Sequence, residues 1–108
     1  MARRVFRKLV RDLVPAHIRA NGEEALTKKL SATAFKKEIV AKLREEVEEV
    51  AAAKTRSTLI DELADVQEVL TALYDAYRIE CSEVTNAARK KRKQRGAFSK
   101  KLFLIETR

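Results

Sequence analysis

The feature that most constrains the fold of this chain is its shortage of residues that interrupt helices. Only two glycines and one proline occur among 108 residues, and these two residue types disfavour helix interiors most strongly. Between them, apolar residues recur at helical spacing. The sequence therefore predicts an all-α protein, folded as a single domain over residues 1–108.

Cap and stop signals place four helices along the chain. We expect a short helix from Pro15 to the Asn21-Gly22 stop, a helix from Thr33 to about Ala53 capped by Thr33 or Ser31, a helix from Ser57 or Thr58 to about Arg78, and a helix from Ser82 to about Arg95 ended by Gly96. Residues 98–105 are rich in apolar side chains and are expected to form a strand or a short extended C-terminal tail. Because the connections are short, the helices should pack as an antiparallel bundle.

A glutamate occupies an apolar position on the second predicted helix. The apolar arc of this helix consists of Phe35, Ile39, Leu43 and Val50. At roughly 100° per residue, Glu46 falls inside that arc, Glu49 lies at its edge and Glu48 points to solvent. The buried side of this helix is therefore predicted to carry a carboxylate.

The third predicted helix carries a second acidic pair. Its apolar stripe consists of Leu59, Leu63, Val66, Leu70, Leu73 and Tyr77. Glu62 and Asp65 lie together on one flank of that stripe, three residues apart. Antiparallel packing of the second and third helices would bring Glu46, Glu49, Glu62 and Asp65 together.

Four carboxylates in one place repel one another, and ionised carboxylates are costly to bury without a positive partner. No lysine or arginine on these arcs can neutralise all four. Mg²⁺ or Mn²⁺, which prefer oxygen ligands, would meet that need. The alternative is that these glutamates form ordinary solvated helix faces, but this explains Glu46 poorly.

Four sequence motifs resemble those of the all-α nucleotide pyrophosphohydrolases, which include the MazG-like proteins, the dimeric dUTPases and the phosphoribosyl-ATP pyrophosphohydrolases. In order, they are KLVRD at residues 8–12 with Pro15, EExxE at residues 45–49, ExxD at residues 62–65 and KRxxRGxF at residues 91–98. The first and last resemble the small MazG-like house-cleaning pyrophosphatases in particular.

The resemblance implies that a nucleoside triphosphate is hydrolysed between its α and β phosphates, with Mg²⁺ as cofactor and Mn²⁺ as a substitute. Glu46, Glu49, Glu62 and Asp65 would be the metal ligands. Glu45 would add a further catalytic carboxylate, beside Glu46 and Glu49, that orients a water molecule. The resemblance also implies a homodimer or a homotetramer.

Basic side chains are the expected contacts for the substrate phosphates, since arginine offers two aligned donors to a phosphate group. Lys91 and Arg95 lie four residues apart on one helix face and are the first candidates. Arg11 and Lys8 come next, and Asn86 is a candidate for a nucleotide contact.

Three other functions remain open. The first is the histidine-pathway activity, phosphoribosyl-ATP pyrophosphohydrolase, on the same fold. The second is a small nucleic-acid-binding protein, because the net charge is +8 and residues 89–95 read RKKRKQR. The acidic pairs would repel a polyanion, so nucleic acid is not the expected partner. The third is a helical interaction module. With no apolar run of membrane-spanning length and one cysteine, we expect a cytoplasmic protein and no membrane partner.

Overall fold

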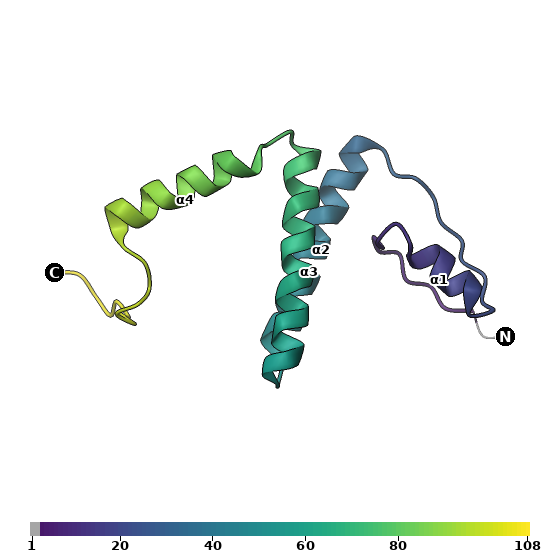
Figure 1. Cartoon of the computed structure of the whole chain (residues 1–108), viewed down its shortest axis with the longest axis horizontal. Helices are drawn as coiled ribbons and strands as arrows, with labels where there is room; N and C mark the ends of the chain where they lie inside the picture. The colour runs from purple at the N-terminus through teal and green to yellow at the C-terminus, as the bar shows by residue number, and fades with distance from the viewer. Residues whose placement is uncertain (1–2) are drawn as a thin grey trace. The chain divides into compact units, whose positions relative to one another are not determined.

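The computed structural model describes residues 3–108 and confirms the all-α prediction. Its helices are α1 (Val14–Ala20), α2 (Ala32–Ala52), α3 (Arg56–Ala76) and α4 (Cys81–Arg95), and the described residues contain no strand (Figure 1). The segment at residues 98–105 is therefore an irregular tail. No helix in the described part of the chain is long and apolar enough to cross a membrane.

The helix ends follow local capping chemistry. Ser31 caps α2, because its Oγ accepts a hydrogen bond from the Ala34 N–H at 3.1 Å. Thr33, the other predicted cap, lies inside the helix. Gly22 and Gly96 both have positive φ, at 87° and 81°, a backbone conformation that glycine adopts without steric cost after a helix. The predicted stops of α1 and α4 are thus confirmed.

The predicted starts of α3 and α4 were each too late in the sequence. Thr55 caps α3, because its Oγ1 accepts from the Thr58 N–H at 3.1 Å while the Thr58 Oγ1 accepts from the Thr55 N–H at 3.2 Å. This reciprocal pair brings Arg56 into the helix. Similarly, the Glu83 carboxylate accepts from the Glu80 N–H at 2.8 Å, so that α4 begins at Cys81.

The chain divides at Arg78–Ile79 into two compact units. In the first unit, α2 and α3 lie side by side as a helical hairpin (Figure 1). Residues 53–55 form the short connection that makes the two helices antiparallel. The second unit consists of α4 and the tail.

The hairpin has a small core. Ile39 on α2 and Val69 on α3 are the buried apolar side chains among residues 3–108, and Glu46 is buried with them. The leucine stripe predicted to pack on α3 is partly exposed, since Leu63 and Tyr77 both keep 49% of their surface accessible. The contact with α2 is instead centred on the side of Val69, which lies seven residues, or two helical turns, from Glu62. Glu62 is therefore on the packing face rather than on its flank.

Residues 3–13, which precede α1, have no regular helix or strand. This segment, called the strap below, reaches both helices of the hairpin through side-chain contacts. Lys8 contacts Glu45 on α2, and Arg11 contacts Asp65 on α3. The basic strap is thus placed against the acidic side of the hairpin.

Candidate metal centre

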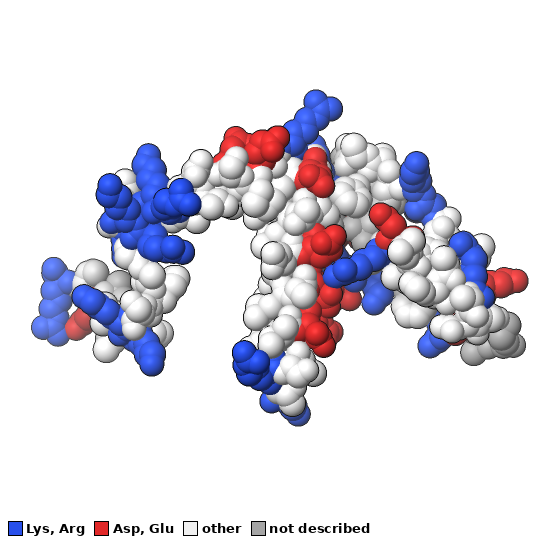
Figure 2. All heavy atoms as spheres, in the orientation of Figure 1, with Lys and Arg blue, Asp and Glu red and all other residues white. Residues whose placement is uncertain are grey.

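Three carboxylates from two helices meet at one point of the hairpin. Glu46 of α2 and Glu62 and Asp65 of α3 each offer an oxygen, and these oxygens lie within 4.8 Å of one another. The two helices pack side by side because residues 53–55 reverse the direction of the chain. Glu62 and Asp65, three residues apart on α3, therefore face Glu46. Figure 2 shows carboxylates gathered along one edge of the hairpin.

Glu46 is the buried member of this cluster, with 8% of its surface exposed. The prediction that this glutamate sits on the buried side of its helix is confirmed. Lys42, one turn earlier on α2, places its Nζ 3.6 Å from Glu46 Oε1 and 3.5 Å from Glu45 Oε1. Lys42 was not among the predicted site residues, although its i, i+4 spacing from Glu46 is a recognisable ion-pair signal.

Glu62 has a perturbed proton affinity. Partial burial raises the pKa of the Glu62 carboxyl, and the negative charges of Glu49, Asp65, Glu46 and Asp61 raise it further. Among the ion pairs of residues 3–108, none involves Glu62. The centre of the cluster therefore holds excess negative charge that a cation would relieve.

The strap supplies counter-charge to the other carboxylates. Arg11 Nη2 donates to Asp65 Oδ1 at 2.7 Å, and Lys8 Nζ lies 3.4 Å from Glu45 Oε1. Together with Lys42, these cations pair with Glu45, Glu46 and Asp65. The positive partners come mostly from outside the two helical arcs, which is why helical spacing alone did not reveal them.

Glu49 lies apart from the tight cluster. It is exposed, and its carboxylate does not belong to the group of oxygens within 4.8 Å. Its charge nevertheless raises the pKa of Glu62, so it lies near enough to share an electrostatic environment with that residue. Its role as a fourth ligand stays a prediction.

The remaining predicted contacts lie in the second unit. Lys91, Arg95 and Asn86 are exposed residues of α4. Asn86 Oδ1 accepts from Arg89 Nη1 at 3.5 Å, within the same helix. Their predicted roles in phosphate or nucleotide binding stay predictions.

The donor set suits a hard divalent cation. Glu46, Glu62 and Asp65 offer only carboxylate oxygens, the ligand type that Mg²⁺ and Mn²⁺ take from proteins. A magnesium ion usually keeps several positions for water and for substrate phosphates. The three carboxylates therefore fit a metal that also binds a polyphosphate.

The all-helical fold and the carboxylates on two adjacent helices agree with the resemblance to the all-α nucleotide pyrophosphohydrolases that the sequence motifs carry. Residues 12–102 match the family model of phosphoribosyl-ATP pyrophosphohydrolase. Since the match covers most of the chain, the protein belongs to that family, whose members are hydrolases acting on phosphoric anhydrides. No curated protein and no solved structure matches the chain. The matched family corresponds to the second of the two activities expected from the sequence, and it lies within the expected superfamily.

Proposed function

We propose that this protein hydrolyses nucleoside triphosphates between the α and β phosphates, releasing a nucleoside monophosphate and pyrophosphate. Its role would be the removal of non-canonical or excess nucleotides. The observation that carries the proposal is the cluster of Glu46, Glu62 and Asp65, whose oxygens lie within 4.8 Å in a chain of a pyrophosphohydrolase family. These residues would hold Mg²⁺, or Mn²⁺ as a substitute, with Glu49 as a further ligand.

A bound divalent cation would withdraw charge from the phosphates and lower the pKa of a coordinated water molecule. The protein contributes the fixed positions of Glu46, Glu62 and Asp65, which are set by helix packing. Glu45, beside Glu46 at the rim of the cluster, would accept a hydrogen bond from the attacking water and orient it. Lys8 and Arg11 in the strap would meet the charge on the departing pyrophosphate. Lys91 and Arg95 of α4 stay predicted phosphate contacts.

Phosphoribosyl-ATP is the second candidate substrate, and the family match favours it. Two sequence motifs support free nucleoside triphosphates instead. KLVRD at residues 8–12 and KRxxRGxF at residues 91–98 resemble segments of the small MazG-like house-cleaning pyrophosphatases.

We also propose that the protein works as a homodimer or a homotetramer. The small core of the hairpin supports this, because Leu59, Leu63 and Tyr77 leave an apolar strip of α3 exposed. A second copy of the chain is the simplest cover for that strip.

A pyrophosphate-release assay tests the proposed activity. The purified protein would be given the common and modified nucleoside triphosphates and phosphoribosyl-ATP, each with Mg²⁺ or with chelator. We expect pyrophosphate from free triphosphates, dependent on Mg²⁺. Release from phosphoribosyl-ATP alone would establish the second candidate, and release from none of the substrates would refute both.

A pair of neighbouring glutamates on α2 provides a matched control. Glu46→Gln removes the buried carboxylate of the cluster. We expect turnover to fall by about a hundredfold or more, since the substitution would weaken binding of the metal ion. Glu48→Gln makes the same change at an exposed position of the same helix and should leave turnover unchanged. Equal activity of the two variants would remove the metal site from the proposal.

A further inference from the structure

The strap joins the two helices of the hairpin at the rim of the carboxylate cluster. Lys8 lies 3.4 Å from Glu45 on α2, and Arg11 lies 2.7 Å from Asp65 on α3. The two cations are three residues apart in a segment without regular structure. One short segment therefore carries positive charge to both walls of the candidate metal centre.

These ion pairs are open to solvent and so are easily exchanged. The Arg11 and Asp65 side chains keep 59% and 42% of their surface accessible, and such pairs are weakened by hydration and by salt. Lys42 differs, because its side chain is 19% exposed and the side chain of its partner Glu46 is 10% exposed. Lys42 is also fixed one turn from Glu46 on the same helix, which makes it a permanent neighbour rather than an exchangeable one.

Arg11 and a divalent cation require the same carboxylate. Asp65 Oδ1 already accepts the Arg11 hydrogen bond, and Asp65 is one of the three residues whose oxygens converge. A doubly charged ion placed among these oxygens would repel the guanidinium and compete for the Asp65 charge. A released guanidinium needs another anion, and a phosphate group matches its planar donors well.

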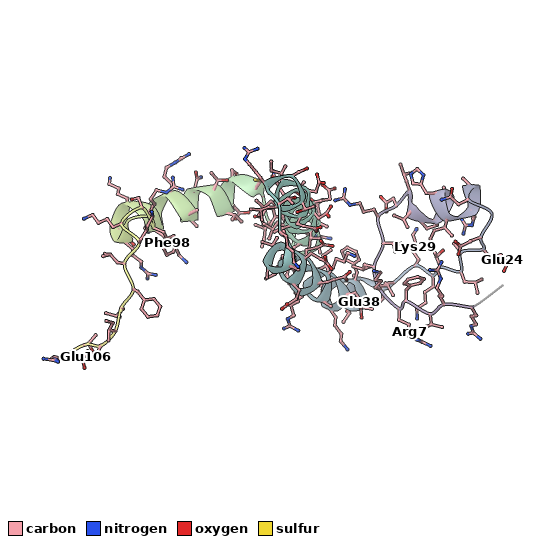
Figure 3. The ribbon with its side chains drawn as sticks, turned by 90° about the horizontal axis from the view of Figure 1, so that it is seen from below. Arg7, Glu24, Lys29, Glu38, Phe98 and Glu106 are labelled. Carbon is pink, nitrogen blue, oxygen red and sulfur yellow. The ribbon has the colours of Figure 1, made fainter. Side chains whose placement is uncertain are left out.

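The strap also borders a small cleft against α2, with a cavity volume of about 100 Å³. Arg7 and Lys8 of the strap and Lys42 of α2 line this cleft, together with Glu38 and Glu45. Figure 3 labels Arg7 of the strap and Glu38 of α2, which both line this cleft. Because Lys42 also contacts Glu46, the cleft lies next to the carboxylate cluster. Three of its lining side chains are cations, and a phosphate would compete with Glu45 for Lys8 and Lys42.

We infer that Lys8 and Arg11 are exchangeable counter-ions. When a divalent cation occupies the cluster, they break their ion pairs with Glu45 and Asp65 and bind the substrate's polyphosphate chain instead. The ligand class is a polyphosphate ester, whose outer phosphate enters the cleft between the strap and α2. This inference rests on the proposed metal site and makes the strap the element that couples cation binding to polyphosphate binding.

Titration calorimetry with Mn²⁺ on the chelator-treated protein, without nucleotide, tests the exchange directly. Arg11→Gln removes the competing cation, so this variant should bind Mn²⁺ about two- to fivefold more tightly than the parent, the range expected for an exposed ion pair. Arg4→Gln is the matched control, because Arg4 makes an exposed ion pair with Glu23 at 3.1 Å outside the cluster. Its Mn²⁺ affinity should equal that of the parent.

A methylene-bridged triphosphate that resists hydrolysis tests the second half of the inference. In the presence of saturating Mn²⁺, Arg11→Gln should bind this analogue at least about tenfold more weakly than the parent, since a bidentate phosphate contact is lost. Arg11→Lys keeps the charge without the planar fork and should recover part of the affinity. Arg4→Gln should again match the parent.

The outcomes separate this inference from the proposed function. If the parent and Arg11→Gln bind Mn²⁺ equally, or the variant binds it more weakly, Arg11 does not compete for the site and the inference is wrong. If Mn²⁺ binding tightens but analogue binding is unchanged, Arg11 is only a counter-ion and the phosphate step is refuted. Absence of Mn²⁺ binding by the parent would overturn the metal site itself.

Discussion

At the scale of single residues, the carboxylates of the hairpin stand in different environments despite their identical chemistry. Glu46 is buried beside Lys42, Asp65 is paired with Arg11, and Glu62 makes no ion pair among the described residues. Glu62 is the one whose pKa is raised, through partial burial first and through its acidic neighbours second. The repulsion among the carboxylates is therefore expressed at Glu62, the member of the cluster without a cationic partner among the described residues.

This raised pKa predicts a pH-dependent stability. A carboxyl group whose pKa is higher in the folded than in the unfolded chain stabilises the fold when protonated, and that stabilisation is lost as the pH rises through the folded-state pKa. For Glu62 the loss begins above the ordinary value of 4.5. We expect the thermal unfolding midpoint of the chelator-treated protein to fall as the pH is raised above this value.

Glu62→Gln should abolish that part of the pH dependence and raise the unfolding midpoint at neutral pH, since it removes the repelled charge. Thermal unfolding followed by circular dichroism between pH 4 and pH 8 measures both effects. Glu48→Gln, at an exposed position, is the control and should follow the parent curve. A neutral-pH midpoint of Glu62→Gln at or below that of the parent contradicts the assignment.

At the scale of elements, the start of α3 is fixed by two threonines. Thr55 and Thr58 exchange backbone and side-chain hydrogen bonds of 3.1 and 3.2 Å and also join their hydroxyls at 2.8 Å. This cap sets where the helix begins and hence which turn Glu62 and Asp65 occupy relative to the connection at residues 53–55. The helix register at the site therefore depends on a cap outside it.

Thr55→Ala should destabilise the fold by about 1 kcal/mol, the usual cost of removing a threonine cap. Urea unfolding gives the free energy of unfolding for each variant. Thr55→Ser keeps the accepting hydroxyl and should recover most of the loss. A Thr55→Ala variant as stable as the parent would mean that the cap does not determine the start of α3.

At the scale of the whole molecule, few apolar side chains are buried within either unit. Ile39 and Val69 are the buried ones among residues 3–108, while Leu63 on α3 keeps half of its surface exposed. In the second unit, Phe98 and Phe103 are 95% and 90% exposed. These phenylalanines are therefore not core residues of their unit.

The proposed self-association predicts that Leu63→Lys shifts the protein toward monomers. The substitution places a charge in the exposed apolar strip, and a buried charge without a partner is costly. Sedimentation velocity across a range of concentrations measures the change. Ala64→Lys adds the same charge at the next, exposed position of α3 and should leave the assembly intact. A parent protein that is monomeric at all concentrations would refute the proposed assembly.

The sequence by itself determined the helices and the identity of the acidic residues. Scarce breakers, helical spacing and local caps act over a few residues, so they fix α1 to α4 to within about two residues at each end. The same spacing placed Glu46 on the buried side of α2, where it lies. These features depend on interactions between residues close together in the sequence, and such interactions can be predicted from sequence patterns.

Only the tertiary structure decided which side of α3 faces α2 and which cations reach the site. The leucine stripe predicted a helix correctly, but the packing centred on Val69 brought Glu62 inward and left Leu63 exposed. Lys8 and Arg11 meet Glu45 and Asp65 across 37 and 54 residues of sequence. Contacts at such separations depend on how segments pack in space, and no local periodicity encodes them.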